Sequence, residues 1–470
     1  MCYLLRMSTP ARPVWFWIVI CVAAAFPAGF TLFASFDQDT WWHLAVGRWI
    51  WSHEQFPVAE PFSRLGTERG ATWVAYSWLY EISMFGLFEA FGPNGIHIAK
   101  SAFGAITVGS IFMYALRREM AAVPAVVILS TLAISLIPFM RERPWHFTVA
   151  FTVITLEAVG RVRDGTPVRR VSWLPLLFIL WANIHIQFVL GWLILGMAVL
   201  FPGKGDRRKL FVLAIACGLA TFVNPYGTQL LQVIWEYATQ AAPRDFINEL
   251  APPEISSVCT WAVFGLMLWA GLVGVRQPRD GFKLGLLIVA VILSTRMRRD
   301  TWFGVLAAVA ILRDVQAPFS VRVRPLTVAM LVCMVFAIAR GYGLLGYGPK
   351  TVPNSEYPLA AMAHIREKNL PGPLYNDFNW GGAIIWGLPN HPVAIDGRTN
   401  LYGSDGLRRA FATWDGTDDW RTDKLLSSAN LVIAPKERVL AVSLRNCPEQ
   451  WAIAFEDDLT IVFTRVGSSH

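Results

Sequence analysis

Residues 36–63 read FDQDTWWHLAVGRWIWSHEQFPVAEPFS, and the interpretation of the whole chain starts from this stretch. Two carboxylates, Asp37 and Asp39, open it, and a tryptophan-rich run follows them. Tryptophan prefers the boundary between membrane and water, where its ring meets apolar surroundings and its N–H stays hydrated. The stretch therefore predicts a helix that lies flat on a membrane surface, with two acids at its start. A loop with an aromatic belt and two solvated acids is the plain structural alternative.

Composition indicates that most of the chain lies in a membrane. Of the 470 residues, 54% are hydrophobic and 16% are charged, whereas a soluble globular protein carries about 25% charged residues. We therefore expect an α-helical polytopic membrane protein with a smaller polar part at one end. The net charge of +8 is typical of cytoplasmic loops that face anionic lipid. No basic and aromatic surface pattern points to nucleic acid as a partner.

Long apolar segments predict about eleven transmembrane helices. The expected spans are residues 14–35, 95–116, 121–140, 145–160, 173–185, 188–201, 210–223, 258–275, 282–295, 302–312 and 325–338. The amphipathic segment 72–92 is predicted not to cross. If it stays on the surface, five loops rich in arginine and lysine fall on one side, as the positive-inside rule requires. We thus expect a bacterial inner-membrane protein with a cytoplasmic N-terminus and a periplasmic C-terminal part.

This topology places two arginine clusters on the outer face, against the rule that the other loops obey. One cluster is Arg141 and Arg143, and the other is Arg296, Arg298 and Arg299. A single arginine there is ordinarily one that snorkels from a helix end. Two clusters on the side of the acids favour phosphate binding, for which the guanidinium group is suited. Three more side chains are expected to line this site, namely His146, His185 and Glu81.

A Gly- and Pro-rich linker, residues 341–355, separates the predicted spans from a C-terminal part. We expect a transmembrane domain over residues 1–345, with an outer loop at 36–94, and a soluble extracytoplasmic α/β domain over 346–470. The motifs NDFNWGG, at 376–382, and DGRTN, at 396–400, follow predicted strands at 373–377 and 393–396. The ends of such strands are where α/β domains place their sites. Turns and a helix cap are the structural alternative.

Acids and arginines at the outer surface of a membrane suit one reaction in particular. A sugar carried on a polyprenyl phosphate presents an anionic leaving group there, and arginines can stabilise its developing charge. A carboxylate can deprotonate the acceptor hydroxyl as it attacks the anomeric carbon. Phosphate leaves without a second acid to protonate it, unlike the leaving group of a glycosidase. The acceptor hydroxyl would belong to a glycan, a lipid or a protein.

Three segments carry a resemblance to a known superfamily. They are DTWWHLA at 39–45, WLYEISMFGLFEAFG at 78–92, and IAKSAFGAITVGSIFMYALRRE at 98–119. Over about residues 14–200 the pattern resembles the GT-C membrane glycosyltransferases, which include protein O-mannosyltransferases and lipid A aminoarabinose transferases. The resemblance implies that Asp39 is the catalytic base, with Asp37 assisting it or binding a divalent cation. Many relatives have Glu after this Asp, whereas Thr40 follows here. Which of the two acids is the base, and whether Glu81 replaces the missing Glu, stays open.

Three other readings of the chain compete with a glycosyltransferase of the cell envelope. A transporter or flippase would place charged groups near the centre of the membrane, whereas the predicted span centres here are nearly uncharged. A non-catalytic scaffold subunit of a polysaccharide-assembly system would use residues 356–470 for docking. An O-antigen polymerase or ligase shares the lipid-linked donor but has a larger late outer loop than residues 224–257.

Overall fold

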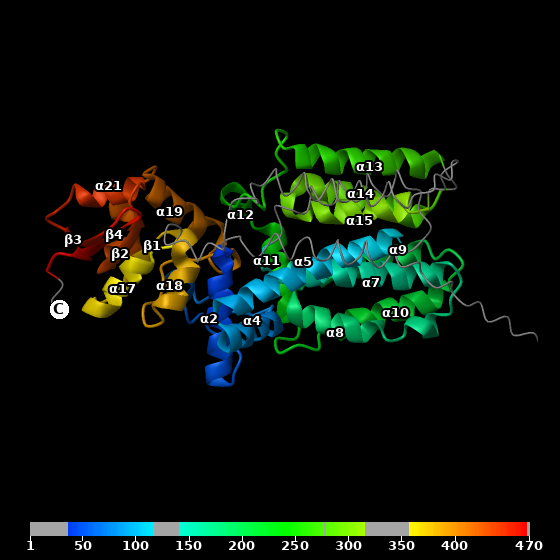
Figure 1. The fold of residues 1–470 in the computed structure, drawn as a ribbon, viewed down its shortest axis with the longest axis horizontal. Helices are drawn as coiled ribbons and strands as arrows, with labels where there is room; N and C mark the ends of the chain where they lie inside the picture. The colour runs from blue at the N-terminus through cyan, green and yellow to red at the C-terminus, as the bar shows by residue number, and fades with distance from the viewer. Residues whose placement is uncertain (1–35, 117–140, 277–278, 315–356, 468–470) are drawn as a thin grey trace, which may run out of the picture.

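The computed structural model describes residues 36–116, 141–276, 279–314 and 357–467. Three predicted spans, 14–35, 121–140 and 325–338, and the linker 341–355 lie outside these ranges. The described chain forms a bundle of roughly parallel helices with a smaller mixed unit packed at one end (Figure 1).

The bundle contains a helix in each of the predicted spans that the structure describes. These helices are α5 (Pro93–Leu116), α7 (Trp145–Arg163), α8 (Leu174–Ile184), α9 (Val189–Leu200), α10 (Arg207–Ala220), α13 (Val258–Arg276), α14 (Gly281–Arg296) and α15 (Thr301–Leu312). Every residue of α15 is buried, so this helix is the core of its part of the bundle. Large apolar side chains on the outer faces of α10, α13 and α14 are exposed instead, among them Phe211, Leu219, Trp261, Leu268 and Ile288. Such outward apolar faces are those of helices that contact lipid.

Two of the described helices, Pro93–Ala115 and Val258–Arg276, are long and apolar enough to cross a membrane by length and composition alone. The others are shorter. The total of eleven spans therefore stays a prediction.

Charged residues of the loops expected in the cytoplasm meet at one end of the bundle. Arg163 pairs with Asp280 at 2.7 Å, and Lys283 pairs with Asp314. The C-terminal unit lies at the opposite end (Figure 1).

A group of shorter helices covers the end of the bundle next to the C-terminal unit. They are α2 (Gln38–His53), α3 (Arg64–Glu68), α4 (Trp78–Phe91), α11 (Gln229–Thr239) and α12 (Ala242–Phe246). The 14 residues of α4 span about 21 Å, less than the ~30 Å of the hydrocarbon core, in line with the predicted non-crossing segment. Gly47 of α2 packs on the α4 backbone, because a Cβ there would overlap the Glu81 carbonyl.

The tryptophans of α2 correct the expected flat interfacial helix. Trp41 and Trp42 are 8% and 4% exposed and lie inside the protein, while Trp51 near the end of α2 is 63% exposed. Two neighbours pack on α2, namely α4 and a helix of the C-terminal unit, α18 (Gly381–Gly387). The expected aromatic belt is therefore largely a protein core.

The C-terminal unit holds a four-stranded sheet in the order β1-β2-β4-β3. Its strands are β1 (Leu374–Asn376), β2 (Leu431–Pro435), β3 (Trp451–Glu456) and β4 (Thr460–Arg465). The first pair is parallel, with Tyr375 opposite Val432, and the other pairs are antiparallel. The remaining helices are α17 (Leu359–Lys368), α19 (Gly403–Asp415), α20 (Lys424–Ser427) and α21 (Val439–Arg445). Strand β1 lies where the sequence predicted a strand, at 373–377.

The predicted strand at 393–396 is wrong, and the error has a physical cause. Val393 forms a single parallel bridge with Ser63, and its N–H donates to the Phe62 carbonyl at 2.9 Å. The Ala394 N–H donates to the Asn376 side chain at 2.8 Å. The outer loop and one side chain thus satisfy the backbone groups that a sheet neighbour would have used.

Candidate active site

The two acids and the first arginine cluster lie together in the structure. Asp37 pairs with Arg141 at 2.9 Å and with Arg143 at 2.7 Å. Arg143 also pairs with Asp39 and lies 3.4 Å from the Glu249 carboxylate. The topology predicted from the loop charges agrees with this proximity, because it placed residues 36–39 and 141–143 on the same face of the membrane.

The acids differ in what surrounds them. The Asp37 side chain is fully buried, and it caps α2 by accepting the Asp39 N–H at 3.0 Å. Burial alone would raise the pKa of Asp37, but Arg143 and Arg141 outweigh it and the pKa is lowered. Asp39 is 17% exposed. Burial, opposed by Arg143 and reinforced by Asp37 and Glu249, raises the pKa of Asp39 to about 7. Asp37 is thus a fixed anion, and Asp39 is accessible and able to take up a proton near neutral pH.

A buried glutamate fixes the loop that carries these arginines. Glu142 accepts the Thr40 hydroxyl at 2.8 Å and pairs with Lys100 at 3.0 Å. Its carbonyl accepts the Tyr80 hydroxyl at 2.9 Å. With residue 142 held inward, both neighbouring guanidinium groups face the acids.

His146 supports the same loop and does not line an open site, contrary to the prediction. It is 1% exposed, and both ring nitrogens are engaged. Its Nε2 lies 2.6 Å from the Arg141 carbonyl and its Nδ1 lies 2.8 Å from the Thr107 hydroxyl. The network assigns the proton to Nε2, because a carbonyl can only accept.

Glu81 lies behind α2, where its partner is a histidine that sequence reasoning missed. The His43 Nδ1 is 3.1 Å from the Glu81 carboxyl, and both side chains are buried. Burial lowers the pKa of His43 and raises the pKa of Glu81, so both side chains favour their uncharged forms. Within the described residues, Glu81 therefore contacts His43 and not the aspartates.

His185 keeps one ring nitrogen available. The Trp181 N–H donates to the Thr148 hydroxyl at 2.9 Å, and that hydroxyl lies 2.8 Å from the His185 Nδ1. Because the hydroxyl accepts from tryptophan, it donates to Nδ1 and leaves the proton on Nε2. Because Nδ1 accepts a hydrogen bond, the imidazole of His185 is neutral.

The second arginine cluster divides among different partners. Arg298 pairs with Glu254 at 2.9 Å, and the Arg296 guanidinium donates to the Ala238 carbonyl at 2.9 Å. The Arg299 Nε is buried and meets no hydrogen-bond partner within the described ranges. Within this cluster, Arg299 is the side chain best placed to bind a ligand. The expectation that all three arginines bind one phosphate does not match the partners of Arg296 and Arg298.

The C-terminal motifs also reach this site. A Cβ on Gly397 would overlap the Asp39 carboxylate and lie 3.3 Å from the Trp42 indole nitrogen. Asn400 accepts the Tyr237 hydroxyl at 3.3 Å, and that hydroxyl lies 3.0 Å from the hydroxyl of Tyr76. The sequence marked these motifs only as strand ends, with no indication of what they contact.

The described residues do not fit the expected divalent cation. Across those ranges no group of three His, Cys, Asp or Glu side chains could hold a metal ion. Both oxygens of Asp37 already face guanidinium groups.

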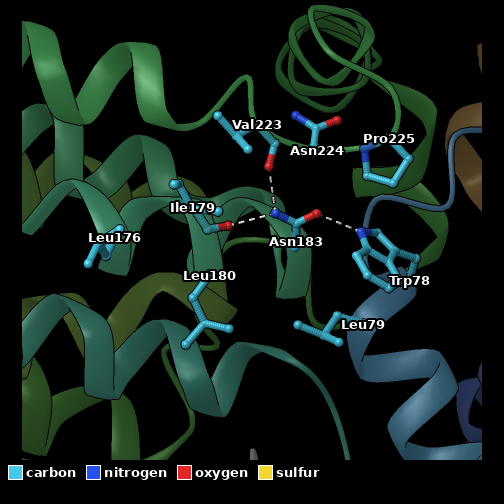
Figure 2. Close-up of a pocket in the computed structure, with 9 residues that line it drawn as sticks. All are labelled: Trp78, Leu79, Leu176, Ile179, Leu180, Asn183, Val223, Asn224 and Pro225. Atoms are coloured by element: carbon cyan, nitrogen blue, oxygen red, sulfur yellow. Dashed lines mark hydrogen bonds between the residues drawn. The ribbon is translucent and has the colours of Figure 1, made fainter.

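An apolar cavity of about 560 Å³ lies beside α4 at the same end of the bundle (Figure 2). Asn183 lies among its lining residues, and its amide is fully engaged. It accepts the Trp78 N–H at 2.7 Å and donates to the carbonyls of Ile179 and Val223 at 2.7 and 2.9 Å. The cavity therefore offers mainly an apolar wall.

Comparison with known proteins relates the chain to two solved structures. An archaeal oligosaccharyltransferase, AglB from Archaeoglobus fulgidus in complex with an inhibitory peptide and a dolichol-phosphate, is 10% identical. Its TM-score is 0.60, over 90% of this chain and 70% of that chain. ArnT from Cupriavidus metallidurans, bound to undecaprenyl phosphate, is 15% identical, with a TM-score of 0.54 over 97% of this chain and 98% of that chain. Neither a family model nor a curated protein sequence matches the chain. At these identities the likeness concerns the fold.

Proposed function

On the premise that this polytopic membrane protein has a GT-C-like fold, we propose that it transfers a sugar from a polyprenyl phosphate to an acceptor hydroxyl. The reaction takes place at the outer face of a bacterial inner membrane, with the N-terminus in the cytoplasm. The observation that carries the proposal is the accessible carboxylate of Asp39. It has a pKa of about 7 and pairs with the guanidinium of Arg143.

In this reaction Asp39 accepts the proton of the acceptor hydroxyl while its oxygen attacks the anomeric carbon. The bond from that carbon to the phosphate oxygen breaks, and polyprenyl phosphate leaves with the electron pair. Asp37 stays ionised and, through its ion pairs, holds Arg141 and Arg143 beside the reacting groups. As Asp39 takes up the proton, its hold on Arg143 weakens and that guanidinium becomes available to the leaving phosphate.

Two further groups are proposed to bind the donor phosphate. Arg299 has an unpartnered buried nitrogen, and His185 presents a neutral N–H donor. The apolar cavity beside α4 supports binding of a hydrocarbon chain, since its lining is mainly apolar and the amides of Asn183 and Asn224 are both engaged in hydrogen bonds. Both neighbouring structures were solved with a polyprenyl-type phosphate bound, which agrees with this class of donor.

The test is sugar transfer from a panel of polyprenyl-phosphate sugars by purified protein in liposomes. Asp39→Asn should fold normally and lose about 10²- to 10⁴-fold in rate, the usual contribution of a general base. Asp418→Asn changes an exposed acid far from the site and is the matched control. If the wild type transfers nothing and Asp39→Asn still complements a deletion strain, the scaffold or transporter interpretation replaces the enzyme.

A further inference from the structure

The Asp39 carboxylate is covered by backbone from the C-terminal unit. Gly397 lies so close that any side chain there would overlap the Asp39 Oδ1. The same glycine lies against the Trp42 indole, where a Cβ would be 3.3 Å from the ring nitrogen. A peptide unit at this distance excludes water from one side of the carboxylate. Burial is also the main reason that the pKa of Asp39 is raised.

A buried ion cluster holds this cover in place. Arg398 is 1% exposed, and its guanidinium bonds to both oxygens of Glu60 at 2.7 and 2.8 Å. It also bonds to both oxygens of Asp396, at 2.6 and 2.9 Å, and lies 4.7 Å from the centre of the Trp73 ring. Glu60 belongs to the outer loop and Asp396 precedes the glycine. The cluster therefore ties the covering segment to the loop that follows α2.

A second glycine contact fixes the cover against the start of α2. A Cβ on Gly382 would lie 2.8 Å from the Gln38 carbonyl, so α18 packs directly on the turn that carries Asp39. The neighbouring Gly381 packs on the backbone of Asp396, where a Cβ would be 2.6 Å from its Cα. The α18 helix and the covering segment thus support each other and contact α2 at two points.

We infer that Gly397 and Arg398 are positioning residues for Asp39, so that the C-terminal unit completes the catalytic centre and is not an appended docking module. This inference rests on the proposed function for its catalytic meaning, but the geometry can be tested without activity. The charged and titratable groups that face Asp39 are Arg143 and Asp37, with Glu249 and Tyr237 further along the wall. None of these belongs to the covering segment, so changes in Gly397 alter burial and leave this set of charges intact.

The experiment measures the protonation of Asp39 directly. The full-length protein in detergent is treated with a carbodiimide, which reacts with protonated carboxyl groups, at pH values from 4 to 9. Peptide mass spectrometry then gives the labelling of Asp39. In the wild type, half-maximal labelling is expected near pH 7. In Gly397→Ala the displaced carboxylate regains water, and the midpoint should fall by about one unit or more.

The matched control is Gly406→Ala in the same unit. Its Cβ would lie 3.2 Å from the Leu65 side chain and 3.7 Å from the Cβ of Tyr402, and a helical position favours alanine. Its labelling midpoint should equal that of the wild type. If Gly397→Ala and Gly406→Ala give the same midpoint as the wild type, the positioning role is refuted.

Arg398→Lys supplies a second variant that leaves the glycine unchanged, in case Gly397→Ala fails to fold. Lysine keeps the charge but cannot reproduce the two-point contacts that the Arg398 guanidinium makes with each of the two carboxylates, so a smaller downward shift of the Asp39 midpoint is expected. An unchanged midpoint in this variant would also overturn the inference. Transfer assays then separate the two proposals. A wild type that labels as expected but transfers no sugar refutes the proposed function alone.

Discussion

Replacing Arg398 by methionine should loosen the C-terminal unit by a predictable amount. The change leaves the carboxylates of Glu60 and Asp396 buried without their cation, and both residues are less than a tenth exposed. Removing one partner of a buried ion pair costs about 3–5 kcal/mol. At about 1.4 kcal/mol for each factor of ten, the open population of the unit should rise roughly 100- to 4000-fold.

The buried thiol of Cys447 reports this opening, because it lies in the core of the C-terminal unit and is 8% exposed. When opening and closing are fast relative to the reagent, the labelling rate of a buried group follows the open population. The rate is measured with a maleimide in detergent solution and quantified for the Cys447 peptide by mass spectrometry. Adding Glu60→Gln to Arg398→Met should recover part of the loss, since one buried charge is then removed.

Arg408→Met is the matched control for this prediction. Arg408 also joins the C-terminal unit to an acid in the bundle, Asp245, but the pair is 3.5 Å apart and about half exposed. An exposed pair contributes about 0–1 kcal/mol, so the labelling rate should change about fivefold at most. Equal rates for Arg398→Met and Arg408→Met would refute the view that the buried cluster holds the unit closed.

Three further outcomes are expected. Lys100→Met leaves Glu142 as a buried charge and should lower stability by about 3 kcal/mol in thermal unfolding, and an unchanged melting temperature would contradict the assigned pairing. The transfer rate should rise with pH through a midpoint near 7, because Asp39 must lose its proton to act as the base; a midpoint near 4 would exclude Asp39 in that role. Gly47→Ala should force α2 and α4 apart and cost about 1–3 kcal/mol. Gly86→Ala in α4 meets no atom within 4 Å and should raise stability slightly, by about 0.5–1 kcal/mol, because a helix interior favours alanine; similar melting temperatures for the two variants would refute this close packing.

The bundle could be predicted because the signals for it are local. An apolar run and the charges that flank it are contained in a short window, and they placed the described bundle helices correctly. The prediction that segment 72–92 does not cross the membrane then placed Asp37 and Arg141 on the same predicted face, without any information on contacts. The fate of residues 393–396 was not predictable in this way. Their backbone partners are Phe62 and Asn376, which no window around residue 393 contains.

Roles within the site were harder to predict than its location. Arginines that break the predicted positive-inside pattern are visible in sequence, but which partner each one contacts depends on packing. Arg298 forms an ion pair with Glu254, whereas the neighbouring Arg299 has a buried Nε without a hydrogen-bond partner among the described residues. The Lys100 and Glu142 pair gave no signal beyond the position of Glu142 between two arginines, because burial is decided by the whole fold.

The placement of Gly397 against Asp39 has a consequence for how the protein is made. A ribosome releases Asp39 early and Gly397 only after every bundle helix has been synthesised. A nascent chain that has already inserted its helices therefore carries an uncovered and incomplete centre. In the proposed topology, the centre becomes whole only when the C-terminal unit has crossed the membrane and packed on α2. If the proposed function holds, prematurely terminated or proteolytically shortened chains would thus lack a working centre.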